Sequence, residues 1–241
     1  MFQKDIATSL PPTTLSLIAY LLDSPYITLD IYNELLDAIS ALSTNCWTIY
    51  KHALAEQEQK MKSTNSSSLP PESISIETMW LPVLRLTCQQ CLRVNPDEQL
   101  DALVLLEDLM CDSNLLVISS AEYNEIISKI ILPTLREVLL QAAGISQSTT
   151  DKPRVTRMSE NEVLENLLEM MVAILQVRFE SLLVLEGFGT LWSQILSIVQ
   201  FVQTISIADG TLQQQNVKAL TVLLKHTSTF GVFDVRRDII E

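Results

Sequence analysis

The sequence contains little glycine and little histidine. The first shortage bears on the fold class and the second on catalytic function. Its five glycines are roughly a third of average usage. Because sheets need glycine-rich turns more than helices do, this shortage favours an all-helical fold. The only histidines, His52 and His226, lie far apart in sequence and offer little support to a nucleophile. With no glycine-rich phosphate loop either, the sequence predicts no catalytic residue, no cofactor and no metal site.

Cysteine is sparse as well, with residues only at positions 46, 88, 91 and 111. Cys88 and Cys91 have the spacing of half a zinc site, but no second pair accompanies them. A thioredoxin-like motif would need a strand–helix–strand context, which the pattern does not provide. The cysteines are therefore predicted to be buried and reduced on helices, which favours a cytosolic protein.

Long apolar runs and positive charge are also lacking. No uninterrupted apolar stretch approaches the ~20 residues that span a bilayer, and the N-terminus lacks the apolar core of a signal peptide. The chain has 16 Lys and Arg against 29 Asp and Glu, a formal net charge of −13. Because so acidic a surface repels phosphate, we predict a soluble protein with no nucleic-acid partner.

Apolar residues at helical spacing are abundant, and one internal repetition organises them. The hexapeptide at 80–85, Trp-Leu-Pro-Val-Leu-Arg, is echoed 51 residues later at 131–136 by Ile-Leu-Pro-Thr-Leu-Arg. We expect Pro82 and Pro133 to bend their long helices. Between them, Asn95 and Pro96 are typical of a helix start. This order indicates a helical-repeat protein.

The predicted fold is all-α, a HEAT- or armadillo-like α-solenoid of about eight helices. A kink or break is expected at Ser43–Asn45, where short polar side chains compete for backbone hydrogen bonds. The stretch Met170–Leu175 is apolar on most sides, so other helices should cover both flanks of its helix. The predicted organisation is N-terminal helices 1–62, a Ser/Pro-rich linker 63–74, a first helical-repeat unit 75–144, a loop 145–158 and a second unit 159–241, forming one continuous solenoid.

Two sets of residues are candidates for a binding site. Lys152, Arg154 and Arg157 form the only basic cluster in the sequence and could contact a phosphoinositide or an acidic partner. Three cations are fewer than the four to eight of lipid-reading clusters, which favours a plain solvated loop. Trp80 and Trp192 are expected to anchor the core; as a pair in an exposed groove they could instead seat a partner helix.

Several of these elements, taken in order, resemble a known family. The pattern is similar to downstream homology regions of the large Arf guanine-nucleotide exchange factors of the Golgi brefeldin-A-resistance type. The chain departs from that family at Pro96–Asp101, where arginines would be expected, so no role of those arginines is carried over. The elements that carry the resemblance are Trp80-x-x-Val83-Leu84, Ala102-Leu103 with Leu106, Tyr123 ahead of Ile131–Leu135, Phe188-x-x-Leu191-Trp192-x-x-Ile195-Leu196, and Val217–Leu220 with Leu223-Leu224.

The resemblance implies a C-terminal helical fragment of a larger cytosolic protein, peripheral at Golgi membranes. The family's exchange reaction uses a glutamate of a separate catalytic domain, after a Leu-Pro-Gly-Glu-like motif, and neither Leu81-Pro82 nor Leu132-Pro133 is followed by Gly-Glu. The expected role is therefore regulation or targeting, and the expected partners are an Arf- or Rab-type GTPase or other trafficking protein, a membrane surface, and the remainder of the parent protein. The alternatives are a scaffold of another trafficking complex and an all-α enzyme.

Overall fold

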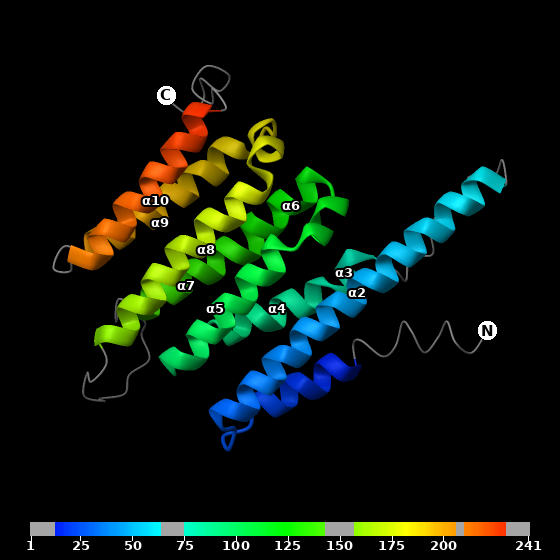
Figure 1. Ribbon diagram of the computed structural model, residues 1–241, viewed down its shortest axis with the longest axis horizontal. Coiled ribbons are helices and arrows are strands. Elements are labelled where there is room, and N and C mark those ends of the chain that lie inside the picture. Colours follow the sequence, from blue (N-terminus) through cyan, green and yellow to red (C-terminus); the bar gives the residue numbers. More distant parts are fainter. Residues whose placement is uncertain (1–12, 64–74, 143–156, 206–209, 230–241) are drawn as a thin grey trace. The chain divides into compact units, whose positions relative to one another are not determined.

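The computed structural model describes residues 13–63, 75–142, 157–205 and 210–229 (Figure 1). All regular secondary structure in these ranges is helical. The contacts divide the chain into two compact units, Met1–Thr87 and Cys88–Glu241, with the division inside helix α4, Leu81–Gln90. The predicted all-α fold is confirmed. The repeat boundaries predicted from the sequence remain a prediction, and the linker and loop proposed there fall largely outside the described residues.

The first unit contains a helix at residues 13–22, the long helix α2, Leu29–Ser63, and the short helix α3, Ile76–Met79. Its core includes Ile18 and Leu22 from the first of these helices and Tyr32 and Ile39 from α2, all buried. The predicted break at Ser43–Asn45 is wrong, because α2 continues through these residues. The hydroxyl of Ser43 instead accepts a hydrogen bond of 2.9 Å from Nε1 of Trp80.

The two repeated Leu-Pro pairs occupy the same position, as the first two residues of a helix. Leu81 and Pro82 open α4, directly after a turn at Trp80 that ends α3. Leu132 and Pro133 open α7, Leu132–Ala142, which follows α6, Ser120–Ile126, and the π-helical segment η2, Ile127–Ile131. Proline has no N–H to donate, so a helix tolerates it best in its first turn. A turn and a π segment, two recognised ways to interrupt an α-helix, place both prolines there.

The second unit is built around α8, Arg157–Leu183. This helix contacts α5, Pro96–Cys111, as well as α6, α7, α9, Phe188–Ile205, and α10, Gly210–Thr229. In Figure 1 it runs between α5 and the α9–α10 pair. Within Met170–Leu175 every side chain except Ala173 is buried. The prediction that helices cover both flanks of this stretch is thereby confirmed.

Local capping signals determine where two of the surrounding helices begin. Asn95 caps α5 by accepting from the backbone N–H of Asp97 at 3.2 Å, with Pro96 at the first helical position. Ser119 and Glu122 form the reciprocal capping box of α6. Each cap satisfies backbone donors that a helix start leaves without an intrahelical partner. The start at Asn95 was predicted from the sequence, and both α5 and α6 contact α8.

Candidate interaction surface

A groove lies between α8 and α10 in the second unit. It encloses about 180 Å³, comparable to one large side chain. Its lining is mostly aliphatic, and it alternates between two segments far apart in sequence. The residues are Leu168, Glu169, Val172, Ala173 and Gln176 on α8, with Gln215, Lys218, Ala219 and Val222 on α10.

The groove also contains polar groups, which could orient a bound side chain. Nζ of Lys218 lies 3.1 Å from Oε1 of Glu169, an exposed ion pair that links α10 to α8. Oε1 of Gln215 is buried and has no hydrogen-bond partner within the described residues. A buried acceptor without a donor is costly, so a partner that supplies an N–H or O–H would gain by entering the groove. This arrangement suits a single apolar side chain that carries or adjoins a donor.

Arg178 and Tyr123 form a clamp that holds α8 to the connection between α5 and α6. Within α8, Arg178 has non-helical dihedrals (φ −137°, ψ 26°). Its guanidinium donates to the carbonyl oxygens of Leu115 at 3.2 Å and Ile118 at 2.9 Å, and lies 5.2 Å from the centre of the Tyr123 ring. The Tyr123 hydroxyl in turn donates to the carbonyl oxygen of Ile174 at 2.9 Å. The connection from α5 to α6 is thus fixed to α8 by hydrogen bonds and a cation–π contact.

The electrostatics of the clamp keep the tyrosine a hydrogen-bond donor. Burial, and to a lesser degree Cys111, raises the pKa of Tyr123 far above its usual value, against a smaller lowering effect of Arg178. The phenol therefore stays protonated across the physiological range. The interaction with Ile174 is therefore a neutral hydrogen bond throughout that range.

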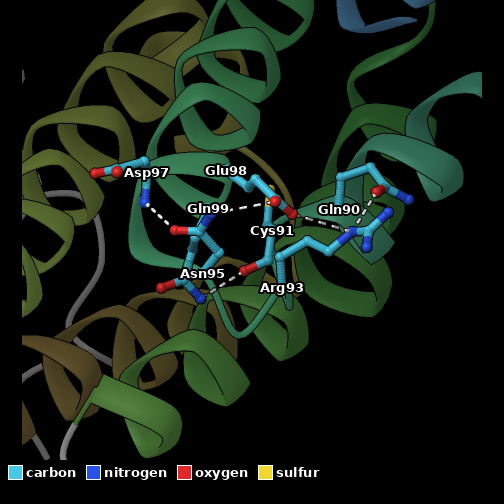
Figure 2. A network of polar contacts seen from close by, with 7 residues as sticks. All are labelled: Gln90, Cys91, Arg93, Asn95, Asp97, Glu98 and Gln99. Carbon is cyan, nitrogen blue, oxygen red and sulfur yellow. Dashed lines mark hydrogen bonds and ion pairs between the residues drawn. The ribbon is translucent and has the colours of Figure 1, made fainter. Parts of the chain in front are cut away.

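A polar network closes the corner between α4 and α5 (Figure 2). Nε of Arg93 donates to Gln90 at 2.9 Å and lies 3.8 Å from Oε2 of Glu98. The other carboxylate oxygen of Glu98, Oε1, accepts from Nδ2 of Asn95 at 3.1 Å. Gln99 donates to the carbonyl oxygen of Cys91 at 2.8 Å. Glu98 and Gln99 lie in Pro96–Asp101, where the chain departs from the resembling family. In this chain the two side chains instead form hydrogen bonds across the corner between α4 and α5.

Carboxylates gather where α5 meets α8. Partial burial, and then the nearby carboxylates of Asp108 and Glu169, raise the pKa of Glu107 above its ordinary value. A raised pKa means that the folded state binds a proton more readily than the unfolded state. Stability from this group is therefore greatest at low pH and is lost as the pH rises through the raised pKa.

We expect Glu107→Gln to raise the free energy of unfolding at neutral pH by roughly 0.5 kcal/mol, a value reduced for solvent screening. At about pH 3.5, where the glutamate is itself protonated, the gain should vanish. Urea unfolding at both pH values measures it, with the exposed Glu180→Gln as control. An equal gain at both pH values would show that charge is not the cause.

The cysteines are placed for packing. Cys46, Cys88 and Cys91 are buried and Cys111 is half-buried, all four as free thiols. Burial raises the pKa of Cys46, Cys88 and Cys111 to about 11 and raises that of Cys91 well above its ordinary value. Thiols with such values are protonated at neutral pH and react slowly. Within the described residues, no group of three or more His, Cys, Asp or Glu could hold a metal ion.

Each tryptophan singled out in the sequence is buried in its own unit. Trp80 is 1% exposed in the first unit and packs 5.3 Å from Trp47 between ring centres. Trp192 is 4% exposed in the second unit, where its ring stacks on Phe188 at 5.9 Å. Neither indole lines an exposed groove. Both lie in cores, the first of the two locations considered from the sequence.

The basic cluster lies at the margin of what the structure describes. Lys152 and Arg154 fall outside the described residues. Arg157 is the first residue of α8, but its side chain is not among those described. The structure therefore assigns no partner or position to this cluster, and its role stays a prediction.

Sequence reasoning missed the clamp and the groove. A signal for the clamp was present, because Arg178 is the only charged residue between Met170 and Phe179. No comparable signal existed for the groove, whose two walls are at least 39 residues apart in sequence. In the described residues, no helix is both long enough and apolar enough to cross a membrane.

Fold and groove together define an all-helical repeat module of the kind that makes protein–protein contacts through its helical faces. Residues 80–230, more than half of the chain, match the family described as "GBF1-like, tetratrico peptide repeat region". The chain belongs to this family, and it is a helical module of a GBF1-type protein. This confirms the predicted relation to Golgi-type Arf exchange factors. Searches of curated proteins and of solved structures gave no match.

Proposed function

We propose that this chain is the non-catalytic regulatory and targeting module of a large Arf guanine-nucleotide exchange factor that works at Golgi membranes. The single observation that carries the proposal is the family match over residues 80–230. The α8–α10 groove supports it, because an aliphatic cleft with one unpaired acceptor suits a protein side chain. Catalysis then belongs to a separate exchange domain of the parent protein.

The partner we propose for the groove is an activated small GTPase of the Arf or Rab type. The purified chain should bind an Arf-type GTPase loaded with a GTP analogue about tenfold more tightly than the GDP form, a difference of about 1.4 kcal/mol. Ala173→Phe should abolish this preference, because the larger side chain fills the groove. Ala55→Phe, a matched change at an exposed position of α2, should leave it intact. Calorimetry with the two nucleotide forms measures both.

The non-catalytic assignment has its own test. Release of a fluorescent GDP analogue from the same GTPase should proceed at the intrinsic rate in the presence of the purified chain. Acceleration of that release would overturn the assignment. Equal affinity for the two nucleotide forms, or loss of binding in Ala55→Phe as well, would reject the groove as the docking site.

Recruitment is proposed to depend on protein contacts more than on lipid. Reversing Lys152, Arg154 and Arg157 to glutamate should leave flotation with anionic liposomes unchanged, as expected for a solvated loop. Each cation at an anionic membrane contributes about 1 kcal/mol, so a true lipid contact would be lost almost completely on triple reversal. Such a loss would reassign the cluster to membrane binding. The alternative function, a scaffold of another trafficking complex, predicts no binding to an Arf- or Rab-type GTPase.

A further inference from the structure

The α8–α10 groove carries an ion pair whose cation can be exchanged for another. Nζ of Lys218 lies 3.1 Å from Oε1 of Glu169, and both side chains line the groove and are more than half exposed. Exposed lysine–carboxylate pairs contribute little to stability, because solvent screens the attraction and both long side chains lose freedom. Lys218 therefore holds Glu169 only weakly, and the carboxylate can accept hydrogen bonds from an incoming side chain.

Carboxylates outnumber cations around Glu169. Partial burial is the largest cause of the raised pKa of Glu107 on α5, and the carboxylates of Asp108 and Glu169 raise that pKa further, so the three groups interact. Among the residues that line the groove, Lys218 is the only Lys or Arg. Three carboxylates against one ammonium leave a net negative charge, which favours a cationic occupant over a neutral or anionic one.

Inside the groove, an unpaired acceptor lies among aliphatic side chains. Oε1 of Gln215 is buried and has no hydrogen-bond partner within the described residues. The same groove is lined by Val172 and Ala173 of α8 and by Ala219 and Val222 of α10. An occupant that satisfies all of these groups needs an apolar stem, a positively charged end and more than one N–H donor.

We propose that the groove is an arginine-binding site, in which the aliphatic stem of a partner's arginine packs between α8 and α10 while its guanidinium bonds to Glu169 and Gln215. The planar guanidinium has five N–H donors and pairs with a carboxylate through two parallel hydrogen bonds. Because that pairing is stronger than the ion pair with Lys218, arginine displaces Lys218 from Glu169. Lysine has the stem and the charge but lacks the planar fork, and tyrosine brings a donor without charge.

A short peptide tests the proposal with the full 241-residue chain. The probe has a single arginine flanked by alanines and blocked ends, and its counterparts carry lysine or citrulline, the neutral analogue of arginine. In NMR titrations, the arginine peptide should shift amide signals of residues 168–176 and 215–222. It should bind about tenfold more tightly than the citrulline peptide, with the lysine peptide between them. Equal affinity for the arginine and citrulline peptides would overturn the proposal.

Two pairs of variants separate the groove from the general acidity of the chain. Glu169→Gln should weaken the arginine peptide about tenfold and remove its advantage over citrulline. Glu180→Gln, the same charge change at another exposed position of α8, should do neither. Lys218→Ala should strengthen binding about threefold, because the competing cation is gone, whereas Lys225→Ala, also exposed on α10, should not. Identical behaviour within either pair would contradict an arginine site in the groove.

The inference rests on the proposed role of the groove as a docking site, but not on a GTPase as the partner, and the two proposals fail separately. If Ala173→Phe removes the preference for the GTP-loaded GTPase while the chain does not prefer arginine to citrulline, docking stands and the arginine site is rejected. If the arginine peptide binds the groove and the GTPase does not bind, the arginine site stands and the GTPase is rejected as its partner.

Discussion

Replacing Trp80 with alanine should lower the free energy of unfolding by about 3–5 kcal/mol, the range for deleting a fully buried aromatic side chain. The indole is 1% exposed, contacts Trp47, and donates its N–H to Ser43. Alanine would leave a cavity beside Trp47 and remove the hydrogen bond that the indole donates to Ser43 of α2. Urea unfolding followed by far-ultraviolet circular dichroism measures the loss.

Two further variants separate packing from hydrogen bonding at Trp80. Ser43→Ala leaves the buried indole N–H without its acceptor and should cost about 1–3 kcal/mol. Trp80→Phe keeps an aromatic ring against Trp47 but removes the donor, so its cost should lie between those of Ser43→Ala and Trp80→Ala. Amide exchange should rise in α2 and α4. A loss below about 1 kcal/mol for Trp80→Ala, similar to that for the exposed Val104→Ala, would mean that this core does not depend on the indole.

A comparable loss, about 3–5 kcal/mol, is expected for Tyr123→Ala in the second unit. Tyr123 is fully buried, its hydroxyl donates to Ile174, and its ring lies under the guanidinium of Arg178. The substitution therefore removes aromatic packing, a hydrogen bond to α8 and the cation–π contact together. Thermal or chemical unfolding gives the total, and amide exchange at 115–118 reports release of the connection from α5 to α6.

Conservative variants assign that loss to its parts. Tyr123→Phe retains the ring and should cost about 1–3 kcal/mol, because the carbonyl of Ile174 loses its donor. Arg178→Lys keeps the charge but replaces the planar guanidinium, whose Nη1 donates to both Leu115 and Ile118 while the group lies over the Tyr123 ring, so protection of residues 115 and 118 should fall. If Tyr123→Phe is as stable as the parent chain, the hydroxyl contributes nothing to the clamp.

The corner between α4 and α5 has a charge pattern that differs from the one expected from the sequence. The resemblance predicts arginines near Pro96–Asp101, yet this chain has Glu98, paired with Arg93 from the connection that follows α4. A corner can be closed by an ion pair of either polarity, provided that opposite charges come from its two sides.

The amino-acid sequence by itself determined the local features of this protein. Asn95 and Ser119 cap helices because a side-chain oxygen reaches backbone donors two or three residues away, and that geometry requires no tertiary contact. The Leu-Pro pairs at 81–82 and 132–133 were recognisable as equivalent for the same reason. Their position was not recognised: we expected both prolines to bend long helices, whereas the structure places them in the first turn of α4 and of α7.

Tertiary structure alone decided the clamp, the groove and the role of Ser43. Tyr123 bonds to a residue 51 positions away and Arg178 to one 63 positions away, and helical periodicity carries no information about which distant helix a face will meet. Ser43, expected to weaken α2, instead receives the Trp80 indole because a neighbouring segment brings a donor to it. The hydrogen-bond partners of these side chains therefore depend on long-range packing, which determines which polar groups are buried together and must bond to one another.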